Sequence, residues 1–378
     1  MKYDFLSFPE RRGTGSLKWD RYGGRDVMPL WVADMDFRSA PEILEALEER
    51  VRHGVFGYTI PHEEPIEAVR RHLRERHGVE AAAESIVWLP GLVPALNLAA
   101  RAFGGKGAGV KTCTPVYPPF LTAPANARVG LESAPLVHDG SRWKLDFPAL
   151  EDFSRGGIFF LCNPHNPVGA CFPREDVERL IALAREKDWV LCSDEIHCDL
   201  VLDPDIDHVP TLPLAAAGDQ VLALYAPSKT WNLPGLACAY AVIPNRELRT
   251  RFRREIQGIV TEINCFGYAG CAAAYGKGEP WRQELLEVLR GNRDQVYRFF
   301  SDKTDLFTIH PMEATYLAWI DCRRLPVQDP ARFFEEHGVG LSDGEPFGDP
   351  GWLRLNFGCP PDWLAAALER MEAAVGSL

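Results

Sequence analysis

Lys229 is the residue of this chain whose surroundings most strongly suggest chemistry. It lies in the run APSKTWNLPGL (residues 226–236), directly after the apolar run VLALY (221–225), which predicts a buried strand. A lysine at the end of a buried strand can have a lowered pKa, and its amine can then act as a nucleophile. The alternative is a surface lysine in a loop, because lysine is seldom buried unless it is paired. The other polar groups near it must decide between the two.

Two loops that follow other apolar runs could bind an anion or a polar ligand. In PGLV a turn opens a predicted helix, so the backbone N–H groups of Gly91, Leu92 and Val93 suit a phosphate; the alternative is a simple turn. In CNPHNPVG (162–169), two Asn-Pro steps and a glycine predict a rigid, non-helical loop. The Asn166 amide could donate to a ligand oxygen, or it could only form an Asx turn.

The run SDEIHCD (193–199) supplies carboxylates directly after a further apolar run. Asp194 could be the counter-ion of a cationic ligand group, or it could be a helix N-cap. The acids and His197 lack a recognised metal-ligand spacing, and no second cluster completes a set, so we expect no metal. Next to Lys229, the hydroxyl of Ser228 could bind the same phosphate as the PGLV turn.

Alternating helix and strand patterns must position these groups. Helices are predicted at 92–103 and 174–187, and short apolar runs predict strands at 86–89, 158–161, 189–192, 221–224 and 239–243. Strands that are apolar throughout, separated by helices, favour a three-layer α/β fold, in which helices cover both faces of a mostly parallel sheet. Ligands bind outside the carboxyl ends of the strands in such sheets, and all four polar groups fall there.

The pattern changes after about residue 280. Long charged helices flank isolated strands at 316–320 and 353–357, which predicts a second, smaller α+β domain joined by the N-terminal segment. We place the large domain at 46–284 and the small domain at 1–45 plus 285–378.

The bulk composition limits the class of function. The chain has 378 residues, 46% of them hydrophobic and 25% charged, with a net charge of −12, which disfavours general binding to nucleic acid or to an anionic membrane. We find no signal peptide and no apolar stretch of membrane-spanning length. The ten cysteines contain no CxxC pair and several stand in strand-like runs, as expected of reduced core thiols in a cytoplasmic protein.

Together the four groups supply a phosphate cradle, an acid for a ring nitrogen, an amide for a ring oxygen and an amine for an aldehyde. Pyridoxal 5′-phosphate (PLP) needs all of these. The chain resembles the fold type I, aspartate aminotransferase-like PLP enzymes of the aminotransferase class I/II superfamily. Within it, the chain is most similar to the MalY/PatB-type C–S lyases, known as cystathionine β-lyases. The resemblance is carried, in family order, by PLWVADMDF (29–37), FGYT (56–59), CNPHNPVG, DEIH, SKTWNLPGL, ATYLAW (314–319), DG (343–344) and RLNF (354–357).

The resemblance implies a role for each candidate residue around the cofactor. Lys229 would bond covalently to the PLP aldehyde, Asp194 would pair with the ring nitrogen, and Asn166 would bond the ring hydroxyl oxygen. Tyr117 would stack on the ring, and His197 would pack near it. The phosphate would be held by Gly91, Leu92, Val93 and Ser228.

The resemblance also concerns the substrate and a partner chain. Arg354 would clamp the carboxylate of an amino-acid substrate by a bidentate pair. Tyr58 would reach the site of a second copy, so we expect a homodimer with a shared active site; the alternative for Tyr58 and Tyr117 is an ordinary core or interface aromatic. Ala226 stands where many relatives carry serine, which would weaken cofactor binding. Ala314 stands where glycine is expected, which would narrow the substrate pocket.

The expected reaction is β-elimination from a cystathionine- or cysteine-type thioether amino acid, which gives a thiol, pyruvate and ammonia. The nearest alternative is an aminotransferase, which shares the removal of the Cα proton. The signature at 31–37 favours the lyase. A further alternative is a PLP-bound regulatory protein that restrains a transcription factor, as relatives in this subgroup do.

Overall fold

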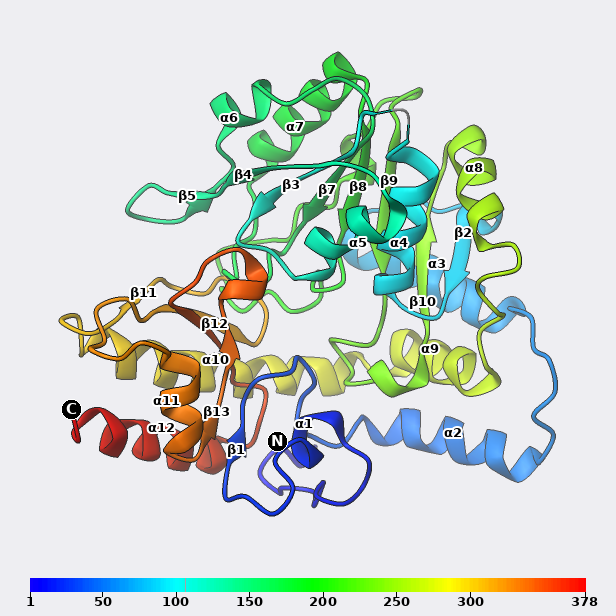
Figure 1. Cartoon of the computed structure of the whole chain (residues 1–378). Coiled ribbons are helices and arrows are strands. Elements are labelled where there is room, and N and C mark those ends of the chain that lie inside the picture. Colours follow the sequence, from blue (N-terminus) through cyan, green and yellow to red (C-terminus); the bar gives the residue numbers. More distant parts are fainter. Residues whose placement is uncertain (106) are drawn as a thin grey trace.

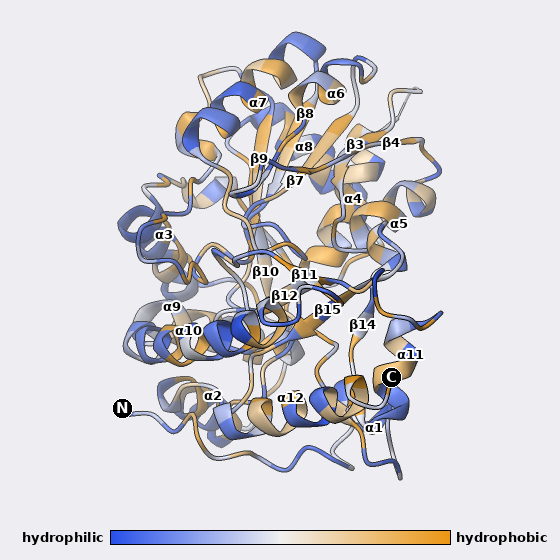
Figure 2. Cartoon of the chain, turned by 90° about the vertical axis from the view of Figure 1, so that its left-hand side faces the viewer, coloured by the Kyte–Doolittle hydropathy of each residue, from blue (hydrophilic) through white to orange (hydrophobic). Residues whose placement is uncertain are grey.

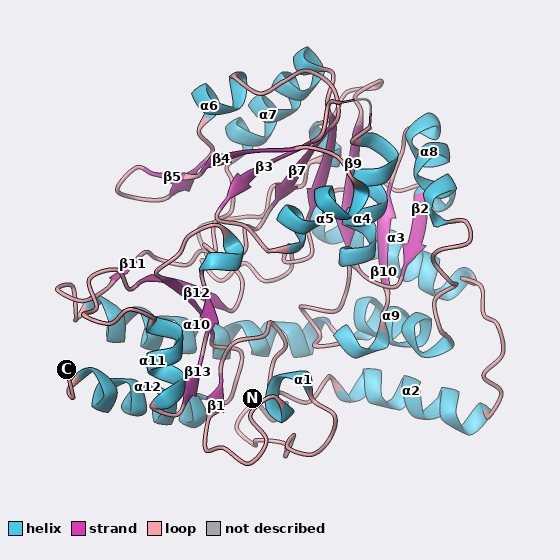
Figure 3. Ribbon diagram, in the orientation of Figure 1, coloured by secondary structure: helices cyan, strands magenta, loops and turns pink. Residues whose placement is uncertain are grey.

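The computed structural model describes residues 1–105 and 107–378. Its centre is a seven-stranded sheet in the order β2-β10-β9-β8-β7-β3-β4, seen in Figure 3. Its strands are β2 (Ile86–Leu89), β3 (Val110–Thr114), β4 (Leu131–Pro135), β7 (Ile158–Cys162), β8 (Val190–Asp194), β9 (Val221–Tyr225) and β10 (Ala239–Val242). Only β10 runs antiparallel to its neighbours β2 and β9; the other pairings are parallel. The predicted mostly parallel sheet is confirmed.

Alternate residues of the central strands are buried on opposite faces, which explains why these strands are apolar throughout. On β9, Leu222 and Leu224 pack in one core with α4 (Leu92–Phe103), whereas Ala223 and Tyr225 belong to the core on the opposite face. The covering helices turn hydrophilic residues outward over the apolar strands (Figure 2). The three predicted layers are therefore present.

Helices cover both faces of the sheet (Figure 1). The core that contains α4 also contains residues of α5 and α8, and two further cores lie across the sheet. These helices are α2 (Pro41–His53), α3 (Glu63–His77), α5 (Pro119–Ala127), α6 (Phe147–Glu151), α7 (Arg174–Lys187), α8 (Arg246–Ile256) and α9 (Cys265–Lys277). Helix α3 ends at Gly78, whose φ of 64° lies in the left-handed region that glycine adopts without strain.

The C-terminal part of the chain builds a smaller, four-stranded sheet in the order β11-β12-β15-β14. Its elements are β11 (Thr308–Ile309), β12 (Leu317–Asp321), β14 (Ser342–Asp343), β15 (Trp352–Asn356), α10 (Glu279–Ser301), α11 (Pro330–Glu336) and α12 (Pro361–Val375). Helix α10 reaches from the large sheet to the small one (Figure 1). This agrees with the predicted α+β unit.

The N-terminal segment lies against the smaller sheet's side of the molecule (Figure 1). After the short helix α1 (Leu17–Asp20), β1 (Met28–Pro29) pairs in parallel with β13 (Val339–Gly340). A hairpin of β5 (Val137–His138) and β6 (Trp143–Lys144) completes the strands. The predicted domain limits at 45/46 and 284/285 fall inside α2 and α10, and the division into two domains stays a prediction. None of the helices in the described ranges is both long and apolar enough to cross a membrane.

Candidate active site

A cavity of about 190 Å³ lies where β2, β7, β8 and β9 end. The predicted residues that line it are Gly91, Leu92, Val93, Tyr117, Asn166, Asp194, His197, Ser228 and Lys229. Residues separated by more than a hundred positions in the sequence thus share one wall. The fold brings them together because the carboxyl ends of neighbouring strands meet at one edge of the sheet.

Lys229 follows β9 by four residues and borders the cavity. Its Nζ donates a hydrogen bond of 2.7 Å to the carbonyl oxygen of Ala33, in the N-terminal segment. Burial and the nearby Arg354 guanidinium lower the pKa of Lys229 from 10.5 to about 8, although Asp34 and Asp194 oppose the change. The surface-loop alternative is wrong: this amine can reach its neutral, nucleophilic form near physiological pH.

Asp194 is the last residue of β8 and is buried. Its Oδ1 accepts a 3.1 Å hydrogen bond from the Ile196 N–H, and the residues that follow form a turn rather than an α-helix, so the N-cap alternative is wrong. Burial raises the pKa of Asp194 to about 7, despite the amide hydrogen bond and the charge of Lys229. A carboxylate in this setting is stabilised by a cationic ligand group.

The next residue, Glu195, has different surroundings. Its carboxylate accepts hydrogen bonds from the Tyr225 hydroxyl at 2.7 Å and from the Thr211 N–H at 2.9 Å, and it lies 3.1 Å from His208 Nε2. Burial alone would raise the pKa of Glu195, but these contacts lower it. Glu195 is thus occupied by its protein partners, and of the two adjacent acids it is Asp194 that lines the cavity.

Arg354, on β15, is buried and adjoins the cavity through Asn166. Its Nη1 donates to Asn166 Oδ1 at 3.1 Å, and its Nη2 donates to the Trp31 carbonyl oxygen at 2.9 Å. Within the described ranges, no carboxylate forms an ion pair with Arg354, and its Nε has no hydrogen-bond partner. Burial lowers its pKa to about 10. A buried guanidinium without a counter-ion is suited to bind an anion.

His197 and Tyr117 contribute ring surfaces to the cavity. Burial, with the charges of Lys229 and Arg354, lowers the pKa of His197 to about 3, so this imidazole is neutral, and its Nδ1 has no partner in the described part of the chain. The Tyr117 N–H donates to the Asn166 carbonyl oxygen at 3.1 Å, which fixes the tyrosine beside the CNPHNPVG loop. Both side chains are thus placed to contact a planar ligand.

One end of the cavity is formed by the start of α4. Gly91 precedes the helix, and no side chain caps the helix there. The first N–H groups of a helix lack intrahelical partners and carry a partial positive charge, so an anion is favoured at this position. Ser228 lines the same cavity.

The two alanine positions singled out in the sequence are both buried. Ala226 packs in the core around α4, so the methyl group contributes to packing. The Ala314 N–H donates to the Gly169 carbonyl oxygen at 2.9 Å, and Ala314 lies outside the lining of the cavity. Their expected effects on cofactor affinity and on the substrate pocket stay predictions.

Tyr58 is not brought to this cavity. It lies in the segment 54–62 between α2 and α3, and its side chain is fully exposed. Its predicted reach into the site of a second copy stays a prediction.

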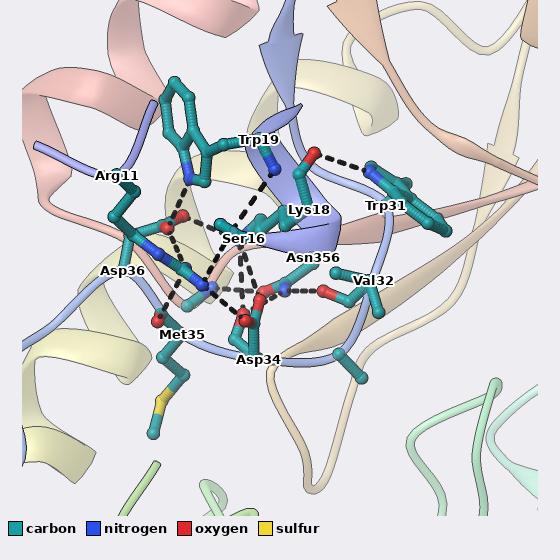
Figure 4. Close-up of polar contacts among 12 residues, drawn as sticks. Arg11, Ser16, Lys18, Trp19, Trp31, Val32, Asp34, Met35, Asp36 and Asn356 are labelled. Atoms are coloured by element: carbon teal, nitrogen blue, oxygen red, sulfur yellow. Dashed lines mark hydrogen bonds and ion pairs between the residues drawn. The ribbon is translucent and has the colours of Figure 1, made fainter. Parts of the chain in front are cut away.

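The sequence reasoning missed how the N-terminal segment is fixed over the cavity. Tyr316 directly precedes β12. Its hydroxyl donates a hydrogen bond of 2.9 Å to the Ala33 carbonyl oxygen, the same oxygen that Lys229 contacts. Asn356 Nδ2 donates to the carbonyl oxygens of Val32 and Asp34, at 2.6 and 2.7 Å (Figure 4). The motif PLWVADMDF marked this segment, but nothing in the motif pointed to these long-range partners.

Two acids of this segment belong to a cluster of paired charges, which we call the N-terminal network (Arg11, Lys18, Asp34 and Asp36). Lys18 Nζ is 2.6 Å from Asp36 Oδ2, and Arg11 bridges Asp36 at 2.5 Å and Asp34 at 2.7 Å (Figure 4). Trp19 Nε1 donates to Asp36 Oδ1 at 2.9 Å. The network holds the backbone that presents the Ala33 carbonyl to Lys229.

Comparison with known proteins identifies the class to which this fold and site belong. The aminotransferase class I and II family matches residues 25–371, and the chain belongs to that family. Cystathionine β-lyase PatB from Bacillus subtilis is 37% identical over 384 residues, which cover 97% of this chain and 98% of PatB. The particular group is that of the MalY/PatB-type C–S lyases, as the sequence motifs predicted.

Solved structures of other proteins have the same fold as this chain. OvoB superposes with a TM-score of 0.95 at 41% identity and 99% coverage of each chain. Cystalysin from Treponema denticola, whose structure contains a pyridoxal 5′-phosphate cofactor, superposes with a TM-score of 0.94 at 31% identity and 100% coverage of each chain. The expected fold type is confirmed, and PLP-dependent C–S lyase activity is supported by these relatives.

Proposed function

We propose that this protein is a PLP-dependent C–S β-lyase that cleaves a cystathionine- or cysteine-type thioether amino acid to a thiol, pyruvate and ammonia. The observation that carries the proposal is the pairing, at one cavity, of a lysine with a lowered pKa and a buried carboxyl group with a raised one. Neither group has an ion-pair partner in the described ranges. A ligand that carries an aldehyde and a ring nitrogen suits both groups, because the lysine amine can react with the aldehyde and the carboxylate can pair with the protonated ring nitrogen.

The residues around the cavity fit PLP. Asp194 would pair with the ring nitrogen, the uncapped start of α4 and Ser228 would hold the phosphate, and Lys229 would bond to the aldehyde. Asn166 would bond the ring hydroxyl oxygen, while Tyr117 and His197 would contact the ring. When bound, PLP supplies an electron sink for the negative charge that develops at the substrate Cα.

The chain's own residues then divide the work of elimination. Arg354 would bind the substrate carboxylate and so orient the Cα–H bond. Lys229 would become a free neutral amine once the substrate amine replaces it on the cofactor; it would then take the Cα proton and hold it at Nζ inside the cavity, where it is available to the departing thiolate. Asp194, kept ionised by the cation it pairs with, would favour the charge shift that accompanies deprotonation.

We also propose that two copies associate with shared active sites. The support is an exposed apolar stretch at the end of α2 and in the segment after it, formed by Val51, Val55, Phe56, Tyr58 and Ile60, with exposed fractions of 56% or more. Large apolar side chains exposed so close together in the sequence favour a protein partner over solvent. Tyr58 is the member of this stretch that would reach the second copy's cavity.

A cytoplasmic location is part of the same proposal. All ten cysteines are free and buried, as expected where thiols stay reduced.

The test is to incubate the purified protein with cystathionine, with and without 2-oxoglutarate, and to measure pyruvate, free thiol and amino-acid products. We expect pyruvate and thiol in equal amounts without any keto acid. Product that forms only with 2-oxoglutarate would assign an aminotransferase instead. The inactive comparison is Asp194→Asn, which keeps the shape of the side chain and removes its charge. This variant should lose turnover both with and without 2-oxoglutarate.

A further inference from the structure

A second cluster of ionisable side chains lies outside the active-site cavity, between α3 and the turn that follows β8. His72 and His77 belong to α3, and Asp199 comes five residues after Asp194. His72 Nε2 lies 3.0 Å from Asp199 Oδ2, and His77 Nε2 lies 3.0 Å from Asp199 Oδ1. The side chains are nearly buried, with exposed fractions of 8%, 3% and 4%. None of the three lines the cavity at Lys229.

The chemistry of these donors is that of a transition-metal site. Two imidazoles and one carboxylate are a set that Zn²⁺ prefers.

The arrangement of the donors also suits a single ion. One potential ligand atom from each residue lies within 4.8 Å of the other two. Each histidine faces a different oxygen of Asp199 at 3.0 Å, so the three side chains point toward one another, and a bound metal ion would replace these two hydrogen bonds.

Space and a further acceptor adjoin the cluster. A cavity of about 530 Å³ is lined in part by His77, Cys198 and His208, and it would admit water to an open coordination position. The ring of His208 lies 5.6 Å from that of His77, and its Nδ1 is buried without a partner in the described chain. Its Nε2 is held by Glu195 at 3.1 Å, an arrangement in which a carboxylate leaves the other ring nitrogen as an acceptor.

Nearby cations are compensated. Arg282 Nη1 donates to the Asp199 carbonyl oxygen at 2.8 Å, but its guanidinium is paired with Glu279 at 2.7 Å. Arg76, whose Nε lies 4.0 Å from Asp199 Oδ1, is half exposed and can turn to solvent. A divalent ion is therefore not opposed by an unpaired buried charge.

We propose that His72, His77 and Asp199 bind one divalent transition-metal ion, Zn²⁺ by preference, with a water ligand facing the adjacent cavity. The ion would connect α3 to the turn that follows Asp194 and contains His197. The spacing within SDEIHCD alone predicted no metal, because the two histidines come from a helix more than a hundred residues earlier. This site is independent of the proposed lyase activity.

The experiment uses tag-free holoenzyme, stripped of metal with a chelator and desalted. Zn²⁺ is titrated in competition with a chromophoric chelator, in the wild type and in His72→Gln, His77→Gln and the double variant. Glutamine keeps an N–H donor for Asp199 and removes the imidazole ligand, so it separates metal binding from simple hydrogen bonding. His62→Gln, at the exposed start of α3, is the matched control.

We expect one Zn²⁺ per chain in the wild type and in His62→Gln, and a loss of affinity of at least about 100-fold in His72→Gln and in His77→Gln. Co²⁺ added to the wild type should give visible d–d bands without a sulfur-to-metal charge-transfer band. Equal affinity in the wild type and the double variant would overturn the proposal. So would the absence of d–d bands from the wild type, a result that holds even if a variant does not fold.

Discussion

Two lysines of this protein are held away from bulk solvent in opposite electrostatic settings. Lys18 is fully buried and its Nζ lies 2.6 Å from the Asp36 carboxylate, within the N-terminal network. Lys229 borders the active-site cavity, and within residues 1–105 and 107–378 its Nζ donates only to the Ala33 carbonyl oxygen, at 2.7 Å. A buried cation with an ionised partner is an anchor, whereas one that lacks such a partner gives up its proton more easily and is available for chemistry.

The comparison is tested most severely by removing the amine of Lys229. Lys229→Ala should lower kcat/KM for cystathionine by about 10⁴-fold or more, because both covalent attachment and the base are lost. The visible absorbance of lysine-bound PLP should disappear as well. Steady-state kinetics and absorbance spectra measure both effects. Lys277→Ala, on the exposed end of α9, is the control and should keep full activity; retention of activity by Lys229→Ala would remove this lysine from the mechanism.

The second test removes the paired lysine. Lys18→Met should lower the free energy of unfolding by about 3 kcal/mol, because it leaves the buried Asp36 carboxylate with only part of its compensation from Arg11 and Trp19. Urea unfolding followed by circular dichroism measures the change. Lys277→Met is the matched surface control and should change stability by less than about 0.5 kcal/mol. An unchanged midpoint for Lys18→Met would mean that the N-terminal network is not an anchor.

The guanidinium of Arg354 is a second buried cation without a carboxylate partner among the described residues, like Lys229, and we expect it to bind the substrate carboxylate. Arg354→Lys keeps the charge and loses the planar fork, so we expect a decrease of about 100-fold in kcat/KM, mainly through KM. Initial rates over a range of cystathionine concentrations give the two constants separately. If KM stayed the same while kcat fell, Arg354 would act elsewhere than on the substrate carboxylate.

The last test concerns Asp194 in cofactor-free protein, where the effect vanishes at low pH. Its folded pKa of about 7 is above the ordinary value of 3.8, so ionisation costs folding free energy as the pH rises from about 4 to 7, and the cost is complete above pH 7. Asp194→Asn should therefore stabilise the cofactor-free protein at pH 8, by up to about 4 kcal/mol, and the gain should shrink toward pH 4. Urea midpoints at several pH values measure it. Asp36→Asn, in the N-terminal network, should instead destabilise the protein at pH 8. A loss of stability in both variants would contradict the proposed difference between Asp194, which is unpaired within the described ranges, and the paired Asp36.

The sequence predicts the active-site cavity well because its residues follow directly from apolar strands. Each of Gly91, Asn166, Asp194 and Lys229 lies at or just beyond a strand's carboxyl end, and parallel strands bring these ends together. The strands β3 and β4 were not predicted, since VKTCT and LESAP mix polar and apolar residues without a clear period. Their place in the sheet is set by tertiary pairing.

Other parts of the site depend on contacts between distant segments, which local patterns do not encode. The Ala33 carbonyl, the Tyr316 hydroxyl and the Asn356 amide meet across nearly the whole length of the chain. Nothing in the short run around Lys18 indicates that this lysine is buried and paired with Asp36. The same reason explains why the sequence did not connect His72 and His77 with Asp199.

The Ala33 carbonyl oxygen that receives both Lys229 and Tyr316 has a consequence for the synthesis of the protein. Its segment is held by Asn356, the last residue of β15, and β1 pairs with β13, so both ends of the chain complete this part of the site. A nascent chain whose β15 is still inside the ribosome already exposes Lys229 but lacks the frame that positions its acceptor. Catalytic competence thus arrives late in translation, after most of the large sheet has been made.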